Sequence, residues 1–283
     1  MQEHKSHYKP LISIIIPCYN DAQYIEQSVL SALNQTYPYK EVIAVDDGSN
    51  DATKAVLKKL EPKITKLITQ ENKGTSAARN IAIAVASGEY ILVLDSDDYF
   101  EPEFCEKAIE IFQKDSNTKM VSCYARWFQN DNFYQIFKPR GGKLKNFLLA
   151  NSSLGTIFFK KNWKEVGGYD EMMVNGFEDW EFYIRLHRNG GRTHVIPDVL
   201  FHYRKKVKSR TTLANENKYE LMEYIYLKHA SLYKENFELF TKHLLDKLKT
   251  EEREKIKNTK RIDFKLGNAI LRPLRFIKSL RRL

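Results

Sequence analysis

Acidic side chains directly follow a short apolar segment in the first half of the chain. Residues 90–94 are apolar or aromatic and lead into Asp95-Ser96-Asp97-Asp98. A run of this length and composition predicts a buried strand. The ligand crevice of an open α/β sheet lies beyond the carboxyl ends of its strands, so Asp95 and Asp97 would reach that crevice. Because Mg²⁺ commonly bridges carboxylates to substrate phosphates, these residues predict a site for a metal ion and a diphosphate.

Taken alone, the same tetrapeptide is equally typical of a solvated turn, or of an N-cap for a helix beginning near Pro102. Two further acidic pairs favour the site for a metal ion and a diphosphate over a turn or an N-cap. Asp46-Asp47 follows a predicted strand over 41–45, and Glu178-Asp179 begins a predicted helix. Parallel strands bring their carboxyl ends to one edge, so the first two acidic clusters should face one crevice. Arg79 lies on a helix predicted between them. There it either offsets the negative charge or hydrogen-bonds a ligand, or it forms a structural salt bridge.

The elements that would position these residues alternate along the first 100 residues. Predicted strands over 11–16, 41–45, 64–69 and 90–94 are separated by helical segments, which indicates a parallel doubly wound sheet. Beyond Pro102 we expect a mixture of elements. They are a helix over 104–113, a strand over 119–124, an irregular aromatic region over 125–140, a strand over 155–160, short strands over 195–197 and 199–203, and helix from 216 to 257.

Charge and cysteine content narrow the class of protein. The 283 residues carry a formal charge of +10. Eleven Lys and Arg against two acids in residues 253–283 account for nearly all of it, so the rest of the chain is close to neutral. Three scattered cysteines without a CxxC pair indicate reduced thiols. Residues 1–10 hold no apolar signal segment, and no run approaches the ~18–20 apolar residues of a membrane span, so we expect a cytoplasmic protein.

Six segments of the chain together resemble glycosyltransferase family 2 in their order and spacing. The resemblance covers about residues 11–205, and each motif alone is weak. The six segments are Ile14-Ile15-Ile16-Pro17-Cys18-Tyr19-Asn20, Val45-Asp46-Asp47-Gly48-Ser49-Asn50-Asp51, Asn72-Lys73-Gly74-Thr75-Ser76-Ala77-Ala78-Arg79-Asn80, Leu94-Asp95-Ser96-Asp97-Asp98, Val166-Gly167-Gly168-Tyr169-Asp170-Glu171 and Glu178-Asp179-Trp180-Glu181.

The resemblance implies a GT-A fold, which is a Rossmann-like α/β arrangement with a mixed sheet flanked by helices. Together with composition and helical patterning, it gives the following expected organisation. Residues 1–10 form a polar tail. Residues 11–210 form the GT-A domain, with a nucleotide-binding half over 11–100 and an acceptor half over 101–210. Residues 211–283 form a helical extension that ends in a basic amphipathic helix over 260–283.

The resemblance also implies roles for residues of the nucleotide-binding half. Pro17 and Tyr19 would line the nucleotide pocket. Asp46 or Asp47 would read the base, usually uracil, with help from Arg79.

The remaining roles concern the metal ion and the reaction. Asp95-Ser96-Asp97 resembles the DxD motif, with Asp95 near the ribose and the metal ion and Asp97 on the Mn²⁺ or Mg²⁺ itself. Asp179 resembles the catalytic base, and Glu178 beside it would position the acceptor or the base.

One position departs from the family pattern. Many relatives carry a metal-binding histidine shortly after a Tyr-Arg pair, whereas here Tyr203-Arg204 is followed by Lys206 at that position. A protonated lysine does not ligate a metal ion but contacts phosphate as a point charge. Either the metal ion has fewer protein ligands, or basic residues take over part of its role.

The C-terminal segment projects as a helix with apolar residues on one broad arc and basic residues opposite, from about residue 270 onward. A basic amphipathic helix is typical of a segment that lies on an anionic membrane surface. A helix packed on the domain, with a solvated basic face, is the alternative.

Together these features predict an inverting, metal-dependent hexosyl- or N-acetylhexosaminyltransferase. It would move a sugar from a UDP-sugar to a glycan or lipid-linked acceptor in cell-surface polysaccharide biosynthesis, at the inner face of the cell membrane. A metal-dependent nucleotidyltransferase on a related fold is one alternative. A nucleic-acid-binding protein using the basic tail is another, which the near-neutral body disfavours; we expect no nucleic-acid partner.

Overall fold

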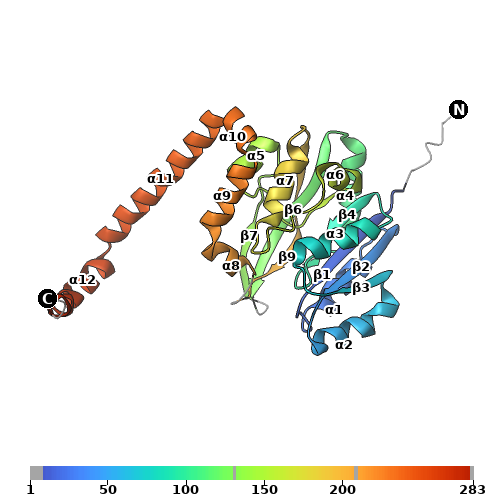
Figure 1. The fold of residues 1–283 in the computed structure, drawn as a ribbon, viewed down its shortest axis with the longest axis horizontal. Coiled ribbons are helices and arrows are strands. Elements are labelled where there is room, and N and C mark those ends of the chain that lie inside the picture. The colour runs from blue at the N-terminus through green and yellow to red at the C-terminus, as the bar shows by residue number, and fades with distance from the viewer. Residues whose placement is uncertain (1–8, 130–131, 207–209, 281–283) are drawn as a thin grey trace. The chain divides into compact units, whose positions relative to one another are not determined.

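A mixed sheet forms the centre of the N-terminal part of the protein (Figure 1). The computed structural model describes residues 9–129, 132–206 and 210–280. Within them nine strands form one sheet, in the order β3-β2-β1-β4-β8-β6-β9-β5, with β7 paired to β6. The chain divides into two compact units, one ending at Ala230 and the other beginning at Ser231.

The first four strands are parallel, as the alternation of strands and helices predicts. The elements of this half are β1 (Ile12–Cys18), α1 (Ile25–Leu33), β2 (Lys40–Asp47), α2 (Asp51–Leu60), the short helix η1 (Glu61–Lys63), β3 (Lys66–Gln70), α3 (Thr75–Val85) and β4 (Tyr90–Val93). From β1 the chain moves outward to β2 and β3, and then crosses back to place β4 on the other side of β1. Ligands of such sheets bind at the switch between these directions, which here lies between β1 and β4.

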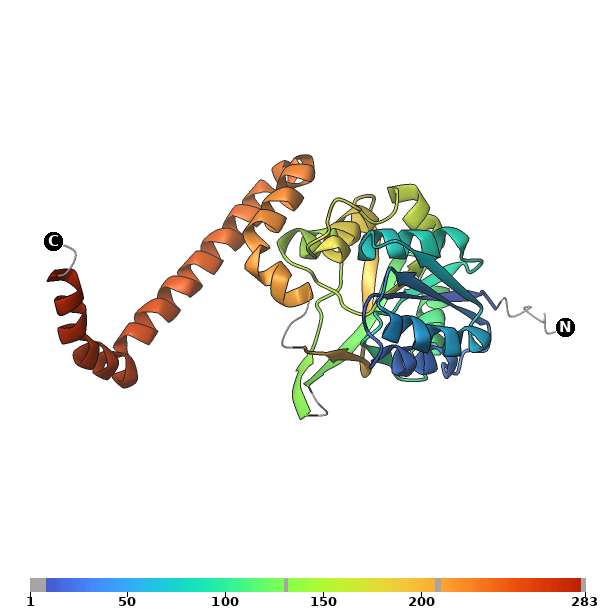
Figure 2. The same cartoon turned by 60° about the horizontal axis from the view of Figure 1, so that its bottom comes forward.

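Both faces of β1 are covered, which explains why its sequence is apolar except for Ser13. Every residue of β1 is buried. Ile14 and Ile16 point into a core cluster that includes Val29 of α1 and Phe104 of α4 (Phe104–Lys114). The opposite face of the sheet is covered by α3, while α1 and α2 lie on the first face (Figure 2). A strand buried on both sides has no polar alternation.

The second half adds antiparallel strands and carries the start of α7 to the sheet edge. Its further elements are β5 (Tyr99–Phe100), β6 (Thr118–Gln129), β7 (Asn132–Phe137), α5 (Leu144–Leu149), β8 (Ile157–Phe159), α6 (Lys160–Val166), α7 (Glu178–His187) and β9 (Arg192–Arg204). Strand β8 is antiparallel to both β4 and β6, whereas β9 is parallel to β6. The expected mixed sheet flanked by helices is therefore confirmed.

Two sequence predictions in this half are wrong. Residues 125–140, predicted to be irregular, contain the end of β6 and all of β7, where Trp127 stacks on Phe137 with ring centroids 5.3 Å apart. Such cross-strand aromatic pairs stabilise strands without any visible polar alternation. The two short strands predicted over 195–203 form one strand, β9. Its register against β6 shifts around Pro197, which has no N–H to donate.

Helices complete both units. Helices α8 (Arg210–Glu216) and α9 (Lys218–Lys228) belong to the first unit, and α10 (Ala230–Glu235) spans the boundary. The second unit holds α11 (Phe237–Lys260) and α12 (Ile262–Leu280), so the helical prediction for the C-terminal region is confirmed. The helix predicted over 216–257 is interrupted at Asn217, His229 and Asn236. No helix among the described residues is both long and apolar enough to cross a membrane.

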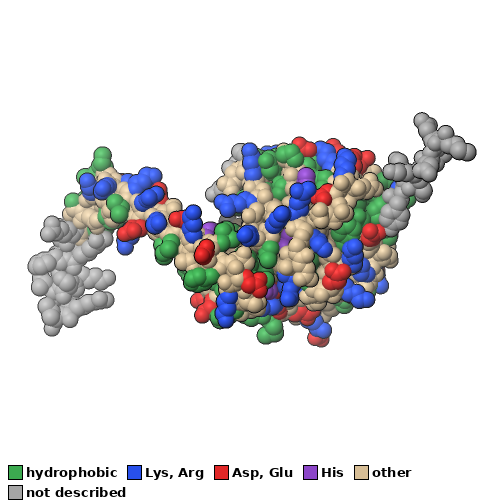
Figure 3. Space-filling view, turned by 90° about the horizontal axis from the view of Figure 1, so that it is seen from above, with side chains coloured by type: hydrophobic (Ala, Val, Ile, Leu, Met, Phe, Trp, Pro, Cys, Tyr) green, Lys and Arg blue, Asp and Glu red, His purple; other side chains and the backbone are tan. Residues whose placement is uncertain are grey.

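The second unit exposes apolar and basic side chains together (Figure 3). No residue of α11 is buried among those described, and Leu248 and Ile262 are 61% and 76% exposed. Side chains from residue 272 onward lie outside the described part of the chain. The amphipathic face predicted there is therefore outside it too, although α12 is helical to Leu280.

Candidate active site

The carboxyl ends of β1, β2 and β4 bring most of the predicted donor-side residues to one edge of the sheet. Pro17 is buried within β1, opposite Val45 of β2, and Tyr19 follows β1 with half of its surface exposed. Asp46 lies at the end of β2, opposite Cys18. Beyond β4 the chain turns, and the N–H of Asp98 donates to the Asp95 carbonyl.

Asp46 and Asp47 organise the loops around this edge. Asp46 Oδ1 accepts a hydrogen bond from Ser49 N at 2.9 Å. Asp47 accepts from Gln70 Nε2 at 2.7 Å and from two backbone N–H groups of the loop that leads into α3, those of Lys73 at 2.8 Å and Gly74 at 2.9 Å. Both carboxylates are buried. These hydrogen bonds hold the loops after β2 and β3 in place. Base recognition by either carboxylate stays a prediction.

Arg79 joins the acids beyond β4 to the acids of α7. Its guanidinium donates to Asp95 Oδ1 at 2.7 Å and to Glu178 Oε1 at 2.9 Å, and it packs 5.3 Å from the centroid of the Tyr169 ring. Burial alone would lower the pKa of Arg79, but the two carboxylates raise it well above its ordinary value. Arg79 therefore holds a fixed positive charge between Asp95 and Glu178, the two halves of the candidate site.

Lys206 lies over the switch point between β1 and β4. Its ammonium is 2.6 Å from Asp97 Oδ2 and 2.8 Å from Asp21 Oδ1, and Ser96 Oγ donates to the other oxygen of Asp21 at 2.6 Å. Burial raises the pKa of Asp97, and the neighbouring Asp95 and Asp21 add to this rise while Lys206 opposes it. Burial lowers the pKa of Lys206, but Asp97 and Asp21 outweigh this and raise it, so the lysine stays charged.

Two residues of this cluster were missed in the sequence. Asp21 follows β1 just as Asp46 and Asp95 follow their strands, so the same rule about strand ends would have identified it. Arg204 supports the Asp97 turn by donating from Nε to the Asp97 carbonyl at 3.0 Å, and its guanidinium lies 4.5 Å from the ring centroids of both Tyr24 and Phe128. Arg204 belongs to the Tyr203-Arg204 pair noted in the sequence, but its role is not evident there because its partners are far away along the chain.

The second carboxylate pair begins α7 after an unusual turn. Gly176 has φ of +114°, and Phe177 has φ of +61°, a left-handed conformation that is uncommon for an aromatic residue. Such strain is typical of functional turns. The turn places Glu178 and Asp179 in the first turn of α7, where the helix dipole favours negative charge.

Asp179 is held by two hydrogen-bond donors and is the more exposed of the pair. Asn151 Nδ2 donates to Oδ2 at 2.8 Å, and the backbone N–H of Trp180 donates to Oδ1 at 2.7 Å. Burial and the adjacent charge of Glu178 raise the pKa of Asp179 to about 6. A carboxylate with a pKa close to neutral pH is well matched to accept a proton. Asn151, on the loop after α5, was not predicted, and nothing in its local sequence marks it.

The predicted metal ligands suit a divalent ion in type and charge. Asp95 and Asp97 supply hard oxygen atoms, and Mg²⁺ is commonly held by one or two carboxylates together with substrate phosphates. Carboxylates outnumber cations in this cluster: Asp21, Asp95, Asp97, Glu178 and Asp179 surround Arg79, Arg204 and Lys206. No group of three His, Cys, Asp or Glu side chains in the described part of the chain is arranged to hold a metal ion, so phosphate oxygens would have to complete the shell.

Residues 13–170 match the model of glycosyl transferase family 2, and the chain therefore belongs to that family. The chain is 34% identical over 197 residues to chondroitin synthase of Pasteurella multocida, covering 67% of this chain and 20% of that protein. It is 30% identical over 203 residues to the putative teichuronic acid biosynthesis glycosyltransferase TuaG of Bacillus subtilis, covering 70% of this chain and 81% of that one. The chain thus spans about a fifth of the length of the synthase.

A solved structure shares this fold. S. aureus TarS 1–349 in complex with UDP-GlcNAc superposes with a TM-score of 0.65 at 24% identity, over 77% of this chain and 64% of TarS 1–349. The GT-A fold expected from the sequence is confirmed.

Proposed function

We propose that the protein transfers a sugar from a UDP-sugar to a hydroxyl group of a glycan or lipid-linked acceptor, with inversion at the anomeric carbon. One observation carries the proposal: the buried guanidinium of Arg79 binds both Asp95, at the predicted diphosphate end, and Glu178, beside the predicted base. A donor bound at the edge of the sheet would therefore lie next to Asp179. The family of the chain and the UDP-GlcNAc complex of TarS support a nucleotide-sugar donor.

The reaction assigns a separate task to each end of the site. The acceptor oxygen forms a bond to the anomeric carbon while the bond from that carbon to the diphosphate oxygen breaks, and UDP leaves with the electron pair. Asp179 takes the proton of the acceptor hydroxyl, a step that typically contributes ~10²–10⁴-fold to the rate. The developing charge on the sugar resembles that of glycoside hydrolysis.

Positive charge is needed where UDP leaves. Asp95 and Asp97 would hold Mn²⁺ or Mg²⁺, which stabilises the charge on the departing diphosphate. Lys206 lies 2.6 Å from Asp97, close enough for its ammonium to contact the same phosphates. Pro17, Tyr19, Asp46, Asp47 and Ser96 would form the walls of the nucleotide pocket.

The relatives and the basic tail support a proposal for the acceptor and the cellular location. The names of the relatives refer to chondroitin and teichuronic acid, which are polysaccharides, so a growing surface glycan or its lipid-linked form is the proposed acceptor. The basic tail over 260–283 would hold the enzyme on the anionic inner face of the membrane, at roughly 1 kcal/mol per basic residue.

A thermal-shift screen of nucleotide sugars tests the proposal. We expect UDP-sugars, with UDP-N-acetylglucosamine as the first probe, to raise the unfolding temperature more with Mn²⁺ than with EDTA. Free uridine serves as the control for binding without a diphosphate. Stabilisation by no nucleotide sugar under either condition would contradict the proposed function.

A further inference from the structure

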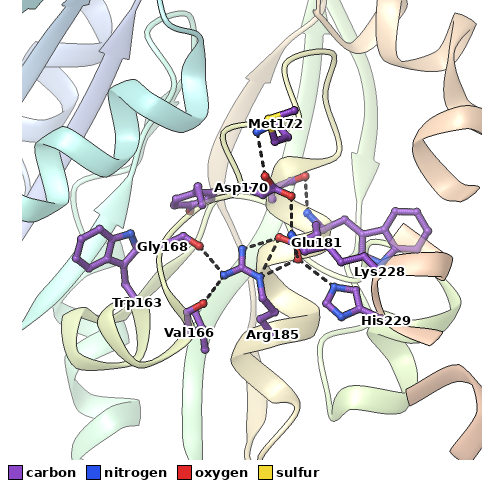
Figure 4. A network of polar contacts seen from close by, with 12 residues as sticks. Trp163, Val166, Gly168, Asp170, Met172, Glu181, Arg185, Lys228 and His229 are labelled. Atoms are coloured by element: carbon purple, nitrogen blue, oxygen red, sulfur yellow. Dashed lines mark hydrogen bonds and ion pairs between the residues drawn. The ribbon is translucent and has the colours of Figure 1, made fainter. Parts of the chain in front are cut away.

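A fully buried carboxylate, Glu181, lies in α7 less than one turn beyond the predicted base. Arg185 binds it through two nitrogens, with distances of 2.5–3.0 Å. Lys228 Nζ lies 2.9 Å from Glu181 Oε1, and His229 Nε2 lies 3.0 Å from the same atom. Burial would raise the pKa of Glu181, but these partners lower it to about 2, so the carboxylate is charged. The network joins α7 to the end of α9 (Figure 4).

The same lysine also binds the loop that precedes α7. Lys228 Nζ is 2.5 Å from Asp170 Oδ2, and the hydroxyl of Tyr224 on α9 donates to that oxygen at 2.8 Å. Arg185 extends the network by donating to the carbonyls of Val166 and Gly168 at 2.7 and 2.6 Å. One side chain of α9 thus ties both α7 and the loop over 166–171.

The loop in turn reaches the donor side of the site. Both backbone groups of Tyr169 bond to the side chain of Asn80 on α3, its N–H donating at 2.8 Å and its carbonyl accepting at 2.9 Å. Asn80 directly follows Arg79, the residue that bridges Asp95 and Glu178. Contacts therefore run without a gap from Lys228 to both ends of the site.

We propose that Lys228 is a positioning residue for glycosyl transfer, because it fixes the start of α7, and with it the Asp179 carboxylate, relative to the bound donor. The proposal rests on the function proposed above. It extends the catalytic apparatus to α9, beyond the residues 13–170 that match the family model. The other helix of this segment also contacts the turn before α7, since a Cβ at Gly176 would lie 2.7 Å from Ala214 Cβ of α8.

The test is Lys228→Met in the full chain, assayed by UDP release from UDP-N-acetylglucosamine and by UDP affinity. Displacement of a catalytic group by about 1 Å costs up to ~10²-fold in rate, so we expect kcat to fall by about 10–100-fold. KM and the Kd for UDP should stay within about twofold of wild type, because no contact to the donor is lost. Lys228→Arg, which keeps the charge, should recover most of kcat.

Lys218→Met is the matched control, since Lys218 lies on the same helix and its ammonium lies over its own neighbour Tyr219. It should leave all parameters unchanged. An unaltered kcat in Lys228→Met, or an equal loss of kcat and UDP affinity, would overturn the positioning role. A wild-type protein that neither binds UDP nor releases it from the donor would instead refute the proposed function.

Discussion

The chemistry of the candidate site is set by how each carboxylate is paired. Asp95 binds Arg79 and Asp97 binds Lys206, whereas Asp179 is held by the neutral amide of Asn151 and a backbone N–H. Opposite charge counteracts the rise in pKa that burial causes. Lys206 does so at Asp97, although the pKa of that carboxyl group is still raised, while burial and Glu178 raise the pKa of Asp179 to about 6. The cation-paired Asp95 and Asp97 suit charged ligands, and Asp179 suits a proton acceptor.

Asn151 should lower the pKa of Asp179, the predicted base. Its amide donates to Oδ2 of Asp179, and a hydrogen bond to the charged form lowers a pKa. Asn151→Ala should therefore raise the pKa of Asp179 above about 6 and move the acidic limb of the kcat–pH profile to higher pH. The rate should rise with pH through that limb, because only the ionised carboxylate accepts a proton. An acidic limb at the wild-type position in the variant would contradict this role.

Asp97 should couple nucleotide binding to the metal ion. Asp97→Ala removes one predicted ligand and frees Lys206 from its shorter ion pair. We expect the gain in UDP affinity on adding Mn²⁺ to disappear, as measured by titration calorimetry with and without EDTA. Asp115→Ala, which alters a carboxylate paired with Arg192 outside the site, is the control. Metal-dependent affinity equal to wild type in Asp97→Ala would disprove the metal role.

Among the helices and strands, the strand ends were predictable from the sequence, whereas the contacts between distant segments were not. The runs at 11–16 and 90–94 identify strands buried on both faces, and the parallel order then brings Asp46 and Asp95 to one edge. Arg204 and Asn151 were missed because their roles depend on partners more than 25 residues away. The β6–β7 hairpin was missed because aromatic residues of the two neighbouring strands pack against each other. They leave no alternation of apolar and polar residues along the chain.

The turn before α7 should depend on glycine at position 176. A side chain there would meet Ala214 Cβ at 2.7 Å, and φ of +114° is unfavourable for any other residue. Gly176→Ala should therefore destabilise the first unit by about 1–3 kcal/mol and lower kcat, as measured by denaturant unfolding and UDP release.

Gly190→Ala is the control that separates the strain of a positive φ from the contact with Ala214. Gly190 has φ of +87°, but no atom lies within 4 Å of its added Cβ. We expect a smaller loss of stability at this position. Equal losses in the two variants would show that the contact with α8 contributes nothing.

At the scale of the whole molecule, the two units carry different charges. The first unit holds the site and is nearly neutral, while the second holds most of the excess basic residues and exposes apolar side chains along α11 and the start of α12. The membrane role proposed above would therefore belong to the second unit.

Removal of residues 260–283 should release the protein from vesicles. We expect the full chain to sediment with vesicles that contain anionic lipid, to bind neutral vesicles weakly, and to lose binding as salt rises. The truncated chain should stay in the supernatant with its unfolding temperature and UDP affinity unchanged. Equal sedimentation of both chains would contradict a membrane role for this segment.

In the proposed reaction Asp179 removes the acceptor proton next to a donor bound at Asp95 and Asp97. The most direct measurement compares UDP release from UDP-N-acetylglucosamine by wild type and Asp179→Asn, alongside the Kd for UDP. The amide keeps the size of the side chain but accepts no proton, so we predict a loss of about 10²–10⁴-fold in kcat with UDP affinity within about twofold of wild type. Turnover at the wild-type rate in Asp179→Asn would rule out Asp179 as the base.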